Sequence, residues 1–210
     1  IKYILTEESE IEKINDIDLI ISTIPLSKVS TIPNIMISLF VNEKDQTLLS
    51  TRITELQKQK KKKEFESYLR ELIIPDFFER KNDLSSQLAC IDYMVKKLEA
   101  KEYVDASFKD EVLERELISS TAFGNFAIPH AMKMYAKKTG LNILVSDNPI
   151  PWGSHEVHLV IMMCFNKNER HIFNEIYDPI TMILSEHENV KQIIACKDYE
   201  EFINTMVSLL

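Results

Sequence analysis

The feature that most limits the fold is an apolar run at residues 158–164, which reads HLVIMMC. A strand that is apolar throughout is typical of the interior of a sheet whose two faces are both covered. A second run, at Leu141–Val145, also predicts a strand. Helical spacing of apolar residues surrounds these runs, at about 84–98, 107–116, 170–185, 190–195 and 199–210. The first of these helices is expected to be capped by Asn82 or Asp83. The second half of the chain is therefore predicted to be an α/β domain with a central sheet flanked by helices.

The first fifty residues show their own alternation of strands and helix. Apolar runs at Tyr3–Leu5, Asp18–Thr23 and Pro33–Phe40 predict strands, and Glu8–Asn15 predicts a short polar helix. This order favours strand–helix–strand units and a parallel sheet. Three strands within about forty residues make a thin sheet, so the segment is expected to be part of a domain.

A long helix is predicted to follow, from Lys44 to Ile74, with Pro75 ending it. Its middle carries a lysine run at Lys58–Lys63, which would suit an acidic partner or nucleic acid. A solvated helix surface is the favoured interpretation, because no aromatic residue or glycine lies between the lysines. The chain is thus predicted to consist of a partial domain at 1–45, a helical linker at 46–80 and a second domain at 81–210.

Charge and composition narrow the class of protein. A formal net charge of −8 argues against direct nucleic-acid binding, which needs a basic face. No apolar run approaches the roughly 20 residues of a membrane span, and the opening IKYILTEESE lacks the features of a signal peptide. The three cysteines (Cys90, Cys164 and Cys196) are odd in number and widely spaced, which favours reduced thiols. The sequence predicts a soluble cytoplasmic protein.

A candidate functional residue lies in the segment TAFGNFAIPHAM at residues 121–132, which holds one of only three glycines in the chain. Gly124 is expected to adopt a positive φ in a tight turn. Pro129 has no N–H and restricts the backbone just before His130, so the imidazole is expected at the end of a short strand with its ring directed by the backbone. A hydrogen-bonded histidine at a sheet edge would show the same pattern, and residue chemistry alone leaves both interpretations open.

The other histidines, Trp152 and Cys164 are expected to have structural rather than chemical roles. His155 and His158 could suggest a metal pair, but no third ligand lies at helical spacing, so no metal site is predicted. His187 is expected to be solvated between helices. Trp152 is predicted to cover part of the core, and Cys164 to be an unreactive core residue in the central strand.

Residues 113–130, LERELISSTAFGNFAIPH, resemble the phosphohistidine signature of the mannitol/fructose-type enzyme IIA of the bacterial sugar phosphotransferase system. That family pattern has an Arg-Glu pair, a glycine, and then an aliphatic-Ala-aliphatic-Pro-His core. Residues 168–172, NERHI, are similar to the segment with the family's second active-site histidine. The resemblance covers about residues 80–210, and the loop after Gly124 is one residue shorter than in the family.

The resemblance implies a site and a chemistry. His130 would accept a phosphoryl group, while Arg115 and His171 would stabilise its charge, and Gly124 and Pro129 would support the loop. The two histidines would face each other across a shallow cleft that a protein partner can reach. Neither a metal nor another cofactor is implied, and the chain would be a phosphoryl-transfer domain rather than a complete enzyme.

The front segment resembles part of a second family. Asp18–Leu26 and the predicted strand at Ile35–Phe40 are similar to the later half of a galactitol-type enzyme IIB domain. Such domains precede IIA in antiterminator-family transcription regulators, although no cysteine occurs here before Cys90. The order implies the C-terminal regulatory region of a sugar-responsive regulator. A phosphocarrier serving a transport IIB component and a binding-only module remain alternatives.

These resemblances also imply partners. The phosphocarrier protein HPr or an enzyme IIB component would exchange the phosphoryl group with His130. In a regulator, the DNA-binding regions of the same protein would respond to it. No direct contact with nucleic acid and no membrane span are expected, and homodimerisation stays open.

Overall fold

The computed structural model describes residues 2–27 and 31–210. They form two compact units, one ending at Lys61 and the other beginning at Lys62. Helix α1 (Glu43–Leu72) contributes residues to both units. None of the helices formed by the described residues combines the length and the apolar character needed to cross a membrane.

The first unit holds a two-stranded parallel sheet. Strand β1 (Ile20–Ser22) pairs with β2 (Asn34–Met36), and a short 3-10 helix, η1 (Glu8–Lys13), precedes them. The predicted parallel pairing of these two runs is confirmed. The strand predicted at Tyr3–Leu5 is wrong: these residues form no strand, and Tyr3 and Ile4 are exposed. A short apolar run becomes a strand only where a neighbour supplies hydrogen bonds and packing.

Helix α1 begins at a reciprocal cap. The Asn42 Oδ1 atom accepts hydrogen bonds from the N–H groups of Lys44 and Asp45, and the Asp45 carboxylate accepts one from the Asn42 N–H at 3.1 Å. This arrangement satisfies N–H groups that the first helical turn leaves without partners. The helix ends before Pro75, so the predicted long helix is confirmed.

A five-stranded mixed sheet forms the centre of the second unit, in the order β3-β6-β7-β5-β4. Strands β6 and β7 are an antiparallel pair that turns at Gly153, where φ is +62°. β3 runs parallel to β6, β5 runs parallel to β7, and β4 is antiparallel to β5. Their bounds are Phe78–Arg80 for β3, Ala122–Phe123 for β4, Phe126–Ala127 for β5, Tyr135–Trp152 for β6 and His155–Asn166 for β7.

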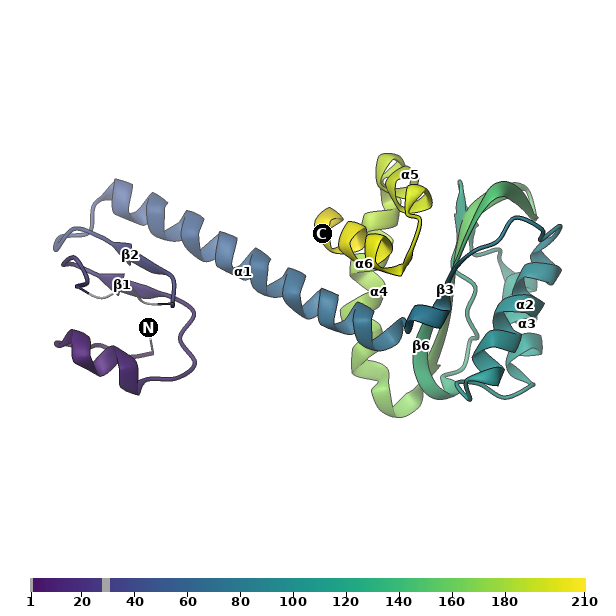
Figure 1. Ribbon diagram of the computed structural model, residues 1–210, viewed down its shortest axis with the longest axis horizontal. Coiled ribbons are helices and arrows are strands. Elements are labelled where there is room, and N and C mark those ends of the chain that lie inside the picture. The colour runs from purple at the N-terminus through teal and green to yellow at the C-terminus, as the bar shows by residue number, and fades with distance from the viewer. Residues whose placement is uncertain (1, 28–30) are drawn as a thin grey trace. The chain divides into compact units, whose positions relative to one another are not determined.

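Helices cover both faces of this sheet. Helices α2 (Gln87–Ala100) and α3 (Phe108–Ile118) lie on one face, and α4 (Arg170–Ser185), α5 (His187–Ala195) and α6 (Tyr199–Leu209) lie on the other (Figure 1). Residues Leu159–Phe165 of β7 are buried throughout. The predicted central strand and the α/β fold class are therefore confirmed.

Helix α2 begins later than its sequence pattern suggests. The predicted cap at Asn82 or Asp83 is wrong, because Ser86 is the N-cap and its Oγ accepts a hydrogen bond from the Ala89 N–H at 3.2 Å. Asn82 instead binds residues of β6, and its Oδ1 accepts from the Asp147 N–H at 2.8 Å. A polar residue with a tertiary partner is thus not free to cap the helix.

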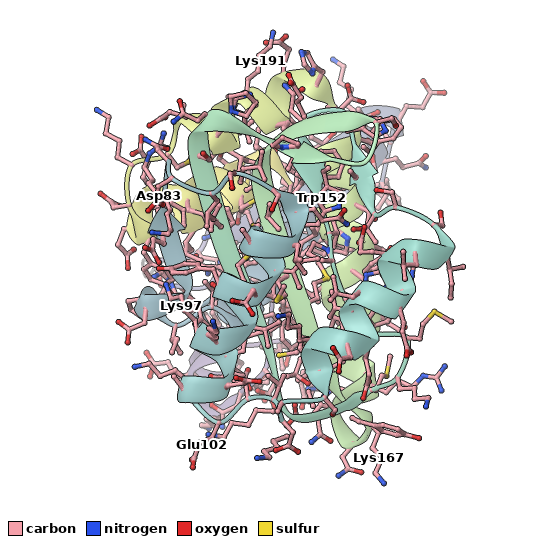
Figure 2. The ribbon with its side chains drawn as sticks, turned by 90° about the vertical axis from the view of Figure 1, so that its right-hand side faces the viewer. Asp83, Lys97, Glu102, Trp152, Lys167 and Lys191 are labelled. Atoms are coloured by element: carbon pink, nitrogen blue, oxygen red, sulfur yellow. The ribbon has the colours of Figure 1, made fainter. Side chains whose placement is uncertain are left out.

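The core predictions hold for two side chains. Trp152 is fully buried, on the face of the sheet that α2 and α3 cover (Figure 2). Cys164 is buried in β7, and burial raises the pKa of its thiol to about 12, so at neutral pH it is an unreactive thiol. All three cysteines are free and buried.

Candidate functional site

The backbone leading to His130 runs alongside the central strand. Strand β5 pairs with β7, and after it the Pro129 carbonyl accepts a hydrogen bond from the Met163 N–H at 3.0 Å. His130 itself forms an isolated parallel bridge with Met163. Proline has no N–H to satisfy, so its carbonyl makes the one backbone bond that this position needs. The half-buried His130 therefore stands on a segment aligned by a buried strand.

The His130 ring is oriented by its own backbone. Its Nδ1 atom lies 2.8 Å from the carbonyl oxygen of Ile128. A carbonyl oxygen can only accept, so Nδ1 must carry the proton of this hydrogen bond. In the neutral ring the other nitrogen, Nε2, then has a free electron pair. The geometry therefore makes Nε2 the nucleophilic atom.

The surroundings favour the neutral form of this imidazole. Burial lowers the pKa of His130 below its ordinary value, and the positive charge of Arg115 lowers it further. The hydrogen bond to the Ile128 carbonyl and the negative charge of Glu116 act in the opposite direction without reversing the shift. At neutral pH the ring is thus mostly unprotonated at Nε2 and ready to attack an electrophile.

Gly124 makes the turn that leads into this segment. Gly124 and Asn125 connect β4 to β5 as a two-residue hairpin loop, and φ of Gly124 is +55°. Glycine at the first of two turn positions is typical of a type II′ turn. The Asn125 carbonyl accepts hydrogen bonds from His158 and Leu159 of β7. The predicted positive φ is confirmed, and Gly124 and Asn125 close a tight turn between β4 and β5.

Replacing Gly124 with alanine is expected to lower the free energy of unfolding by roughly 1–2 kcal/mol, because an L-residue at positive φ is strained. An added Cβ would meet no atom within 4 Å, so the effect isolates backbone strain. Urea denaturation followed by circular dichroism measures it. Asn125→Ala, at a neighbouring position without a positive φ, is the matched control and should change little. Equal stability of Gly124→Ala and the wild type would contradict the turn geometry.

Helix α3 supplies the charged groups near His130. The half-buried Arg115 donates from Nη1 to the Ser119 carbonyl at 2.6 Å, which holds the guanidinium at the C-terminal end of α3. Its positive charge is one of the causes that lower the pKa of His130. The site therefore combines a nucleophilic nitrogen with a cation that can neutralise an incoming anion.

Sequence reasoning missed a buried carboxylate beside Arg115. Glu116 is only 9% exposed and accepts hydrogen bonds from three residues that are far apart from one another in the chain, namely Gln87, Thr121 and Trp152. A signal for it was present, because Glu116 follows Phe108 and Val112 at intervals of four and all three are buried. A charged residue on the inner face of a helix indicates a polar contact inside the protein.

His171 is placed separately, as the second residue of α4, and it is exposed. The Glu169 carboxylate just before α4 accepts a hydrogen bond from the Thr139 N–H at 3.1 Å, which ties this helix start to β6. Within residues 2–27 and 31–210, no hydrogen bond joins His171 to His130. Both residues belong to segments next to β7: His130 bridges its residue Met163, and α4 begins shortly after β7 ends.

The other histidine pair has ordinary structural surroundings. The His158 Nδ1 atom lies 2.9 Å from the Ser146 carbonyl oxygen, and His155 lies at the turn between β6 and β7. In the described part of the chain no three histidine, cysteine, aspartate or glutamate residues are grouped so as to hold a metal ion.

A family model described as "Phosphoenolpyruvate-dependent sugar phosphotransferase system, EIIA 2" matches residues 71–208. This range contains Arg115, His130 and His171. The mannitol-specific phosphotransferase enzyme IIA component of Halalkalibacterium halodurans is 33% identical over 107 residues, which are 49% of this chain and 72% of that protein.

A regulator also matches, over more of the chain. The probable licABCH operon regulator of Bacillus subtilis is 28% identical over 186 residues, or 88% of this chain. Residues 71–210 are too few to hold a match of 186 residues, so the match to the regulator also includes residues before 71. The chain spans only 28% of that regulator's length.

Solved structures show the same fold. In a complex of mannitol enzyme IIA with phosphorylated enzyme IIB from Escherichia coli, a matching chain gives a TM-score of 0.55 at 17% identity. The match covers 63% of this chain and 95% of that one.

Proposed function

Because the chain belongs to the EIIA 2 family of the phosphoenolpyruvate-dependent sugar phosphotransferase system, we propose that it is the regulatory region of a sugar-responsive transcription regulator, phosphorylated on His130. The observation that carries this choice is the extent of the two matches. The regulator matches 88% of the chain, including residues before 71, whereas the mannitol enzyme IIA component matches 49%.

The proposed reaction is transfer of a phosphoryl group between two imidazoles. The Nε2 electron pair of His130 attacks phosphorus, and the P–N bond of the donor phosphohistidine breaks. The electron pair of the broken P–N bond remains on the donor imidazole, which then takes up a proton. Since the bond formed and the bond broken are of the same kind, little free energy is lost, and the protein contributes mainly position and charge.

Two further side chains stabilise the transferred group in this proposal. The Arg115 guanidinium offers a forked donor to the phosphoryl oxygens. His171 donates an imidazole N–H from the start of α4, where the helix dipole also favours an anion. Gly124 and Pro129 set the path of the backbone that carries His130. The shallow site that results is open to a protein donor.

The partners follow from this chemistry. HPr or an enzyme IIB component exchanges the phosphoryl group with His130 in the cytoplasm. The response passes to the DNA-binding regions of the parent protein. The short parallel sheet and the helix α1 that follows it are proposed to be a partial IIB-like domain at 1–45 and a helical linker at 46–80, and the end of this linker, from residue 71, already lies within the family match. No cysteine occurs before Cys90, so this front part carries no phosphocysteine.

A second function has its own support. The mannitol enzyme IIA component shares 33% identity over 72% of its length, and an enzyme IIA of the same fold forms a complex with a phosphorylated IIB. The chain would then be a phosphocarrier that passes its phosphoryl group to a transport IIB component.

One experiment tests the proposed function against this alternative. With labelled phosphoenolpyruvate, enzyme I and HPr, the chain is expected to gain one acid-labile phosphoryl group. Membranes that contain enzyme IIB and IIC components are then added with sugar. The regulator function predicts no sustained sugar phosphorylation, whereas catalytic turnover of sugar would favour the carrier. A wild-type chain that stays unlabelled would overturn both and favour a module that only binds protein partners.

A further inference from the structure

We infer that Glu116 is a positioning residue for His130, which orients the nucleophilic nitrogen through a line of hydrogen bonds across two backbone segments. This inference rests on the proposed phosphoryl transfer at His130, and it assigns a role to a residue that does not touch the phosphoryl group.

The Glu116 carboxylate is held by donors from a helix, a strand and a loop. Gln87 Nε2, at the start of α2, and Trp152 Nε1, at the end of β6, each donate to its Oε2 atom at 3.0 Å. The Thr121 N–H donates to the same atom at 3.2 Å, and the Thr121 hydroxyl donates to Oε1. A buried carboxylate is costly unless it is hydrogen-bonded in this way. Glu116 therefore ties α3 to α2, β6 and the chain segment just before β4.

A continuous line of bonds leads from this carboxylate to the imidazole. The Thr121 N–H binds Glu116, and the Thr121 carbonyl accepts a hydrogen bond from the Ile128 N–H at 3.3 Å. The Ile128 carbonyl in turn accepts the Nδ1 proton of His130 at 2.8 Å. Any shift of Thr121 thus moves the carbonyl that selects the tautomer of His130. The position of Nε2 depends on a group three hydrogen bonds away.

Charge gives Glu116 a second, separable effect. Among the charged groups that act on His130, Arg115 lowers the pKa of the imidazole and Glu116 raises it, and both lie on α3. A substitution that removes the charge of Glu116 but keeps its shape should change only the pKa of His130. Removing the acceptor oxygens should also release Thr121.

The substitutions Glu116→Leu and Glu116→Gln separate the two effects. Leucine has a similar volume but no acceptor, so the Thr121 N–H and hydroxyl lose their partner. Glutamine retains an acceptor oxygen and loses the charge. Gln87→Leu is the matched control, because it removes another donor from the same carboxylate but none of the bonds in the line to His130. Glu114→Gln, on the exposed side of α3, controls for surface charge.

Nitrogen-15 NMR of His130 in the full chain is the first measurement. The wild type, Glu116→Gln, Gln87→Leu and Glu114→Gln are expected to show one neutral tautomer with the proton on Nδ1. Glu116→Leu should show both tautomers. This readout needs no phosphoryl transfer, so it remains decisive if His130 proves not to be phosphorylated. A single Nδ1-protonated tautomer in a folded Glu116→Leu protein overturns the inference.

Transfer kinetics from phosphorylated HPr are the second measurement. In Glu116→Leu the kcat should fall on the order of 100-fold, the cost of a misplaced reacting group, with KM for HPr little changed. Glu116→Gln should retain a kcat within a few-fold of the wild type, with its pH profile displaced to lower pH because the pKa of His130 falls. If Glu116→Leu does not fold, Glu116→Met replaces it, because methionine also offers the Thr121 N–H no oxygen acceptor, and this variant must lower kcat more than Gln87→Leu does. Equal effects of those two variants overturn the inference.

Discussion

The His130→Ala protein is expected to take up no phosphoryl group from phosphorylated HPr, while the wild type takes up one. The substitution removes the imidazole whose Nδ1 proton is engaged by the Ile128 carbonyl and whose Nε2 is therefore free. Transfer needs that electron pair, so the loss is complete rather than partial. Acid-labile label retained on the protein after gel filtration measures the result.

His158→Ala is the matched control for this loss. His158 is also half-buried, and its Nδ1 likewise lies against a backbone carbonyl, that of Ser146, at 2.9 Å. It belongs to the same sheet but is not among the proposed site residues, so its variant should be labelled like the wild type. Circular dichroism must show that both variants fold. Full labelling of His130→Ala would refute the assignment of the nucleophile.

Long, periodic elements were predictable from local sequence. The apolar run in β7 and the helical spacing in α1, α4 and α6 gave the right element types, because burial on both faces and amphipathic spacing leave strong patterns. The positive φ of Gly124 was also predictable, since a glycine before a short strand indicates a turn.

Short strands and tertiary caps were not predictable. β3, β4 and β5 have two or three residues each, too few for a period, and they form only because longer strands pair with them. The cap at Ser86 was missed for a related reason. Asn82 has equal capping ability, but its side chain binds Asp147, a residue 65 positions away in the chain.

The candidate site also has some features that local sequence predicts and others that depend on tertiary contacts. The Pro-His pair and the Arg-Glu pair are visible as local motifs, so His130 and Arg115 could be named from sequence. The tautomer of His130 and the role of Glu116 depend on contacts from residues 87, 121, 128 and 152, which only the folded sheet brings together. The spacing of Phe108, Val112 and Glu116 could have placed Glu116 on the inner face of α3, but it could not have identified the donors to its carboxylate.

His171→Ala is expected to accept the phosphoryl group about 10²–10³-fold more slowly than the wild type, and to reach full labelling in time. The nucleophile at His130 is intact in this variant, so the end point does not change. What is lost is a donor at the start of α4, where an exposed imidazole and unpaired helical N–H groups can meet phosphoryl oxygens. One preorganised donor of this kind contributes about 2.7–4 kcal/mol to the stability of a transition state.

His187→Ala is the matched control for His171→Ala, because His187 is also exposed and begins helix α5 without belonging to the proposed site. Rapid-quench measurement of the first turnover should find the His187 variant unchanged. A His171 variant as fast as the wild type would show that this residue does not contact the transferred group.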